Sequence, residues 1–141
     1  MKTILWATLA ANGNYAQSGP ENPPTKEALA DFAAQAKAAG NFIVGRRTFE
    51  SIAGNGGGGG PFADLDIVVI SNSIPNSANI HNSFLGQELV DEVIFNVAPV
   101  LEGKGLNLLI DKDHYRCKHV ELLDCKPLGG GVVQLRYAIN R

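Results

Sequence analysis

The order of the apolar segments along the chain is the feature that most constrains its fold. An apolar run at residues 3–9 precedes a helical pattern, and a second apolar run at 42–45 follows it. Both runs are rich in β-branched and aromatic residues, which is typical of buried strands. A third such run lies at 66–71, and beyond residue 92 apolar runs follow one another with only turns between them. This order predicts an α/β domain, with a mixed central sheet flanked by helices and antiparallel strands at its C-terminal edge.

The helix between the first two runs has clear boundary signals. Thr25 is a residue type that caps helix N-termini, and Gly40 can end a helix in a left-handed conformation. Apolar residues recur at helical spacing on one face, at Leu29, Phe32, Ala33 and Ala36. The sequence therefore predicts an amphipathic helix over residues 25–40.

The second half of the chain predicts mainly strands. After a brief helix at 82–87, we expect antiparallel strands at 93–101, 120–125 and 131–139, with turns at 103–105 and 127–131. No internal repeat or linker divides the chain. We therefore expect a single domain over residues 1–141, a length that is typical of single domains.

Composition excludes several classes of protein. With 45% hydrophobic residues and a formal net charge of −2, the chain resembles neither a disordered protein nor a strongly basic nucleic-acid binder. No apolar run approaches the roughly 20 residues that a membrane-spanning helix needs. The two cysteines lack CxxC spacing and the three histidines lack metal-ligand spacing, so neither a disulfide framework nor a metal site is expected. A cytoplasmic protein is the expectation that follows.

Residues that suit an anion follow the second apolar run. Gly45 lets the backbone approach a ligand closely. Arg46 and Arg47 offer guanidinium groups to a phosphate, and Thr48 adds a hydroxyl. The alternative is that both arginines are solvated and that Thr48 only caps a short helix.

Two other segments also have two interpretations. Ser71 and Asn72 follow the third apolar run, at a strand end where α/β sheets bind ligands, although such residues are also common in ordinary turns. The glycine tract at 56–60 could be a mobile flap or phosphate loop, or a surface connection without a fixed conformation.

Four segments together resemble one family. VGRRTFESI at 44–52 resembles the motif after the second strand of dihydrofolate reductases and of the reductase domains of riboflavin biosynthesis. ATLAANGNYA at 7–16 is similar to the family's first strand and turn. LVDEVIFNVAPVLEGKGLNLL at 89–109 resembles the region around a family proline, and VELLDCKPLGGGVVQLRYAI at 120–139 resembles the closing hairpin. The match covers most of the chain in the same order, and it is nearest to the riboflavin-biosynthesis branch of the dihydrofolate-reductase-like superfamily.

The resemblance implies an enzyme that transfers hydride from NADPH to a pyrimidine-linked ribosyl or pterin-like substrate. By position, the residues that would lie near the cofactor's pyrophosphate are Gly45, Arg46, Arg47 and Thr48. Ser71 and Asn72 would lie near the adenosine 2′-phosphate. The nicotinamide carboxamide would meet Ala7 and the backbone of the turn that contains Tyr15 and Ala16.

Glu27 and Asp31 are the candidate catalytic acids. The family carries a helix carboxylate a few residues before the position of Phe32, and these two acids are the nearest ones. Both could instead serve only to complement the helix dipole. The folate branch also holds its substrate with a basic residue beyond the second helix. This chain has only glycine there, which favours a phosphoribosylamino-pyrimidine over folate.

The chain departs from the family in one place. Relatives carry a strand, a helix and a further strand ending in Gly-Gly between the positions that match Asn79 and His81, a unit of roughly 30 residues. We expect that the given sequence omits this central segment. The alternative is a true deletion, which would leave backbone groups of the sheet without partners.

Two other functions stay open on the sequence alone: dihydrofolate reduction, and a non-catalytic scaffold that keeps the same fold. The expected partners are a small-molecule substrate and, as in riboflavin-type relatives, a second copy of the chain in a homodimer. Nucleic acid and membrane partners are not expected.

Overall fold

A computed structural model of the chain describes residues 1–15, 24–45, 64–70, 77–103 and 117–140. Along these residues the elements follow in the order β1 (Ile4–Ala10), α1 (Lys26–Ala39), β2 (Asn41–Gly45), β3 (Asp66–Ile70), α3 (Ser77–Gly86), β4 (Glu92–Ala98), β5 (Val120–Gly129) and β6 (Val132–Ile139). The predicted α/β class is confirmed, and each predicted strand has a counterpart. The helix expected at 82–87 begins earlier, at Ser77.

The strands of the described residues form two sheets. The larger sheet has the order β1-β4-β6-β5, and β2 and β3 form a separate pair of parallel strands. β4 lies antiparallel to β6, as predicted for the C-terminal strands, and it also pairs in parallel with β1, which makes the sheet mixed. A local sequence pattern cannot show that β4 pairs with a strand more than 80 residues earlier in the chain.

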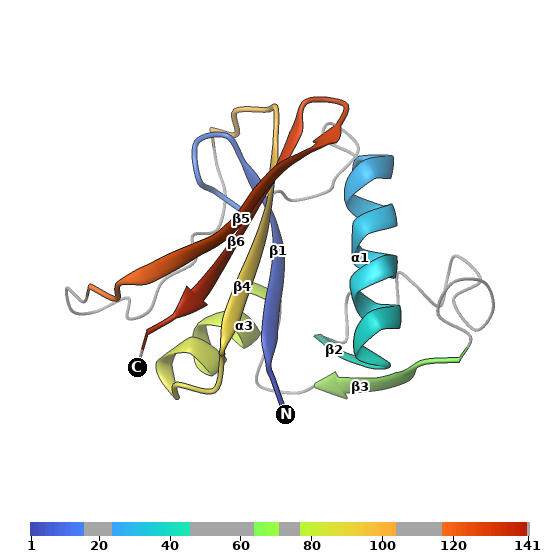
Figure 1. The fold of residues 1–141 in the computed structure, drawn as a ribbon, viewed down its shortest axis with the longest axis vertical. Helices are drawn as coiled ribbons and strands as arrows, with labels where there is room; N and C mark the ends of the chain where they lie inside the picture. Colours follow the sequence, from blue (N-terminus) through green and yellow to red (C-terminus); the bar gives the residue numbers. More distant parts are fainter. Residues whose placement is uncertain (16–23, 46–63, 71–76, 104–116, 141) are drawn as a thin grey trace.

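Helix α1 packs against both sheets. The ring of Phe32 lies 5.0 Å from that of Trp6 on β1 and 5.2 Å from that of Phe42 on β2. Figure 1 shows β2 and β3 next to the C-terminal end of α1, where they form a sheet separate from that of the long strands. The single continuous sheet that the sequence predicts is therefore divided, with β1 and β2 each at the edge of its own sheet. The prediction of a missing segment near 79–81 stays a prediction, and α3 runs through these positions.

The predicted ends of α1 are confirmed. The Thr25 hydroxyl accepts a hydrogen bond from the Ala28 amide at 3.1 Å, and Gly40 adopts a left-handed conformation with φ of 81°. The predicted apolar face is shifted, because Leu29 is 52% exposed. Ala28 is buried in its place, and with Phe32 and Ala36 from the predicted face it forms a stripe at i, i+4 and i+8.

Two apolar clusters stabilise the fold. The first lies on the far side of the four-stranded sheet from α1, where Leu5, Ala7 and Val93 pack with Leu85 and Val90. The second joins α1 to β2 through Ala36, Phe42 and Val44. The prediction that the third apolar run is a fully buried strand is wrong, because Val68 and Val69 of β3 are 53% and 37% exposed. None of the described helices is long and apolar enough to cross a membrane.

Candidate active site

An open groove of about 540 Å³ lies beside the first turns of α1. Residues four apart on a helix share a face, so Glu27 and Asp31 point to the same side of α1. Both acids line the groove, together with Lys26, Ala30 and, from β5, Leu128. The structure thus brings the two predicted catalytic acids into one site. Figure 1 shows that the N-terminal end of α1, which carries the lining acids, lies toward the carboxyl end of β1, the end at which α/β sheets commonly bind ligands.

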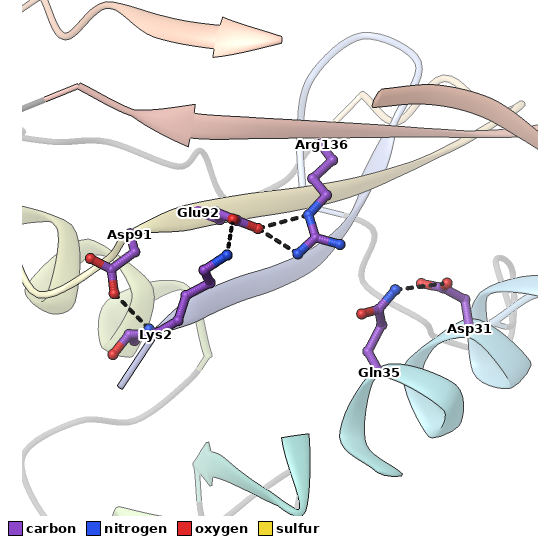
Figure 2. A network of polar contacts seen from close by, with 7 residues as sticks. Lys2, Asp31, Gln35, Asp91, Glu92 and Arg136 are labelled. Carbon is purple, nitrogen blue, oxygen red and sulfur yellow. Dashed lines mark hydrogen bonds and ion pairs between the residues drawn. The ribbon is translucent and has the colours of Figure 1, made fainter. Parts of the chain in front are cut away.

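Asp31 is fixed by side chains of the sheet beneath it. Its Oδ2 accepts a hydrogen bond of 2.8 Å from Trp6 Nε1 and one of 3.0 Å from Asn96 Nδ2. Asn96 Oδ1 in turn accepts a bond of 2.9 Å from Gln134 Nε2. On α1 itself, Gln35 donates to Asp31 Oδ1 at 3.5 Å, a long contact that Figure 2 shows. The Asp31 carboxylate is therefore held in one position from β1, β4 and β6.

These donors keep Asp31 charged. Partial burial raises the pKa of the Asp31 carboxyl, but hydrogen bonds from Trp6, Asn96, Gln134 and Gln35 outweigh burial and leave that pKa below its ordinary value. At neutral pH Asp31 is an anion that can accept N–H or O–H bonds from a ligand. It suits substrate binding better than proton donation.

Glu27 has a different environment. No described residue hydrogen-bonds to its carboxylate, which instead packs against the tight turn that joins β5 to β6. A Cβ built on Gly130 would lie 2.9 Å from Glu27 Cδ, and one built on Gly131 would lie 2.9 Å from Pro99 Cγ. The backbone of this turn therefore fits between Glu27 and Pro99 because the turn has no side chains. Of the two acids, Glu27 is therefore the one whose carboxylate accepts no hydrogen bond from the described part of the chain.

The other described residues predicted for cofactor binding lie apart from the groove. Ala7 neighbours Trp6 on β1, so its side chain faces the opposite side of the sheet, and only 2% of it is exposed. Tyr15 lies in the same core, and its hydroxyl is hydrogen-bonded to Nδ1 of His81 on α3. Burial raises the pKa of Tyr15 and lowers the pKa of His81 to about 4. The side chains of Ala7 and Tyr15 are packed into the core. Only the backbone groups of these two residues could therefore contact a cofactor.

The predicted phosphate-binding segments begin at one edge of the smaller sheet. Gly45, the buried last residue of β2, pairs in register with Ile70, the last residue of β3. Gly45 and Ile70 therefore lie side by side at the carboxyl ends of the two strands. The predicted residues that follow them lie outside the described part of the chain, as does Ala16: Arg46, Arg47, Thr48, Ser71 and Asn72. The same holds for the glycine tract at 56–60.

A cluster of charged residues stabilises the four-stranded sheet beside the groove. Glu92 accepts a hydrogen bond of 2.6 Å from Lys2 Nζ and one of 2.7 Å from Arg136 Nε, as Figure 2 shows. Burial raises the pKa of Glu92, but its bonds to Lys2 and Arg136 outweigh this and lower it overall. The cluster ties the start of β1 to β4 and β6. No group of three or more potential metal ligands occurs among the described residues.

Asn96 and Gln134 are the site residues that the sequence analysis missed. Each is a single polar residue within an otherwise apolar strand segment, VIFNVA for Asn96 and VVQL for Gln134. Such an interruption is a usable signal, because a buried amide needs hydrogen-bond partners. Trp6 on β1 is a further donor to Asp31 in this site.

The sequence matches no family model and no curated protein. Solved structures do match. Acinetobacter baumannii RibD superposes with a TM-score of 0.70 at 15% identity, over 100% of this chain and 59% of that one. The chain thus spans little more than half the length of RibD.

Two further structures match over most of their own length. A pyrimidine reductase-like protein from Corynebacterium diphtheriae has a TM-score of 0.72 at 12% identity, over 99% of this chain and 92% of that one. The riboflavin biosynthesis reductase Rib7 from Saccharomyces has a TM-score of 0.56 at 10% identity, over 99% of this chain and 90% of that one. The chain therefore has the dihydrofolate-reductase-like fold of these riboflavin biosynthesis and pyrimidine reductase-like proteins.

Proposed function

We propose that the chain is a pyrimidine reductase-like enzyme that transfers hydride from NADPH to a pyrimidine-linked ribosyl or pterin-like substrate. The observation that carries this proposal is the placement of Glu27 and Asp31 in one groove beside the sheet. The fold supports it, because its structural neighbours include riboflavin biosynthesis reductases.

Asp31 and Glu27 have different roles at the substrate. Asp31, held as an anion, accepts hydrogen bonds from N–H groups of a heterocycle and so orients the ring. Glu27, which no described residue hydrogen-bonds, exchanges a proton with the substrate as hydride is delivered. Lys26, also on the groove, suits an anionic substituent of the substrate.

The described residues fit the proposed cofactor at one point. Gly45 and Ile70 are paired at the carboxyl ends of β2 and β3, so the last described residues before Arg46 and Ser71 lie side by side. On this proposal Arg46, Arg47 and Thr48 bind the pyrophosphate, and Ser71 and Asn72 bind the 2′-phosphate. The backbone of Ala7, Tyr15 and Ala16 binds the carboxamide. When bound, NADPH supplies the hydride, and the protein supplies position and charge.

Steady-state turnover tests the function. NADPH oxidation is followed by absorbance with a ribosylamino-pyrimidine phosphate and, separately, with dihydrofolate. Glu27→Gln is the test variant, and Glu121→Gln, on the exposed strand β5, is the matched control. We expect turnover with the pyrimidine, a loss of roughly 10²- to 10⁴-fold in Glu27→Gln, and no change in the control.

The other outcomes decide between the remaining functions. Turnover with dihydrofolate that an antifolate blocks would identify a dihydrofolate reductase. NADPH binding without turnover of either substrate would identify a non-catalytic member of the fold. Full activity in Glu27→Gln would show that Glu27 takes no part in the reaction.

A further inference from the structure

Two buried amides lie side by side under the groove. Asn96 on β4 and Gln134 on β6 are directly opposite each other in the antiparallel register, and they are 0% and 3% exposed. Burying an amide is costly unless its donor and acceptor groups find partners. Both residues have them, and no described buried side-chain nitrogen or oxygen atom lacks a partner.

The hydrogen bonds of this pair run in one direction only. An ionised Asp31 can accept but not donate, so Asn96 must turn its amide NH₂ toward Asp31 Oδ2, at 3.0 Å. The Asn96 carbonyl oxygen then faces Gln134, which must turn its own NH₂ toward it, at 2.9 Å. Reversing Asn96 would place its carbonyl oxygen against the carboxylate, where the two acceptors would repel each other. Gln134 opposes that reversal, because its donor holds the Asn96 oxygen on the far side.

We propose that Gln134 is a positioning residue of the groove: it locks the Asn96 amide in the orientation that fixes the Asp31 carboxylate in place. Locked in this way, Asp31 keeps Oδ2 bound to the sheet. Its Oδ1 accepts the 3.5 Å contact from Gln35, which is long enough to leave room for a bond to a ligand. The benefit to reduction rests on the proposed function, whereas the link from Gln134 to Asp31 does not.

The side chains that hydrogen-bond to Asp31 from the sheet are uncharged, so the two amides have a large effect on the pKa of its carboxyl. Trp6 comes from β1, Asn96 from β4 and Gln134 from β6, and all three are uncharged. Leu128 of β5 is apolar. The charged groups nearby are Glu27 and Lys26, on the exposed groove, and Arg136, whose guanidinium binds Glu92. Loss of the Gln134 donor therefore reaches Asp31 both through Asn96 and through the hydrogen bond that Gln134 itself donates to the Asp31 carboxylate.

Carboxyl NMR of the whole chain tests the proposal without any need for turnover. The Asp31 signal is assigned by its loss in Asp31→Asn, and its titration is compared between the wild type and Gln134→Leu. Gln87→Leu, at an exposed position directly after α3, is the matched control. We expect the pKa of Asp31 to rise by about half a unit to one unit in Gln134→Leu and to stay unchanged in Gln87→Leu. A folded Gln134→Leu protein with the wild-type pKa for Asp31 would overturn the proposal.

A measurement on the wild type covers the case in which Gln134→Leu fails to fold. The side-chain NH₂ resonances of Asn96 and Gln134 should both shift with pH at the Asp31 midpoint, and both shifts should vanish in Asp31→Asn. Gln134 resonances that ignore the titration of Asp31 would contradict the proposal. If the reductase function is also right, Gln134→Leu moves the acid limb of the kcat/KM profile upward by the pKa change that NMR records. A pKa change without any turnover would reject the function and leave the positioning role intact.

Discussion

The glycine turn between β5 and β6 offers a graded set of substitutions around Glu27. Gly129, Gly130 and Gly131 all have positive φ, at 100°, 60° and 82°. An added Cβ at Gly129 would meet Glu27 Cγ at 3.8 Å, an ordinary contact. At Gly130 it would lie 2.9 Å from Glu27 Cδ and Oε1. Gly130→Ala therefore displaces the Glu27 carboxylate, and Gly129→Ala does not.

The two substitutions should be similar in stability and different in activity. A side chain in the left-handed region costs about 1–2 kcal/mol, so both variants lose about that much free energy of unfolding. The overlap at Gly130 adds little to this, because the Glu27 carboxylate ends a flexible side chain and can swing aside. To reach an ordinary separation it must move by about 0.6 Å or more. A displacement of that order at a reacting group can lower the rate by roughly 100-fold.

Paired measurements on the two variants check this reasoning. Denaturant unfolding gives the stability of each protein, and NADPH oxidation with the pyrimidine substrate gives kcat/KM. We expect matching losses of stability and a large loss of kcat/KM in Gly130→Ala alone. Equal kcat/KM values in the two variants would show that the turn does not position Glu27 for the reaction.

Three further predictions concern the supporting structure. Trp6→Phe keeps a ring beside Phe32 but removes the indole N–H that donates to Asp31. Chemical denaturation should show a loss of about 1–3 kcal/mol in the free energy of unfolding, and NMR should show a higher pKa for Asp31. An unchanged pKa would count against the bond from Trp6. Because burial lowers the pKa of His81 to about 4, its contribution to folding is complete above about pH 6.5 and is lost as pH falls toward 4. As the pH falls from 7 to 5, the free energy of unfolding should therefore decrease less in His81→Phe than in the wild type. Parallel curves of unfolding free energy against pH would refute this. Leu122 on β5 is 55% exposed, and if β5 pairs two copies of the chain, Leu122→Lys should convert a dimer to a monomer in light scattering; a wild-type monomer would refute the homodimer.

Local sequence chemistry was sufficient to predict α1 and most of the strands. Thr25 and Gly40 mark the helix ends through hydrogen bonds and backbone conformations that depend on only a few neighbouring residues. The two acids at positions 27 and 31 share a groove because helical periodicity alone places them on one face. These features required no knowledge of tertiary contacts.

Tertiary pairing decided the features that the sequence did not predict. The apolar composition of β3 cannot show that Val68 and Val69 lack cover, because that depends on which elements pack against the strand. The pairing of β4 with β1 and the division of the sheet depend on contacts between distant segments. The amide pair of Asn96 and Gln134 likewise arises from the register between β4 and β6, which brings together residues 38 positions apart.

Binding of NADPH is the most direct test of the proposed function. The chain is titrated with NADPH, and nicotinamide fluorescence is followed, with NADH as the comparison. We predict saturable binding with a Kd below about 1 mM, within the range usual for enzyme ligands, and weaker binding of NADH, which lacks the 2′-phosphate. A linear, non-saturating response to NADPH through the millimolar range would contradict the proposal that this fold serves as a reductase.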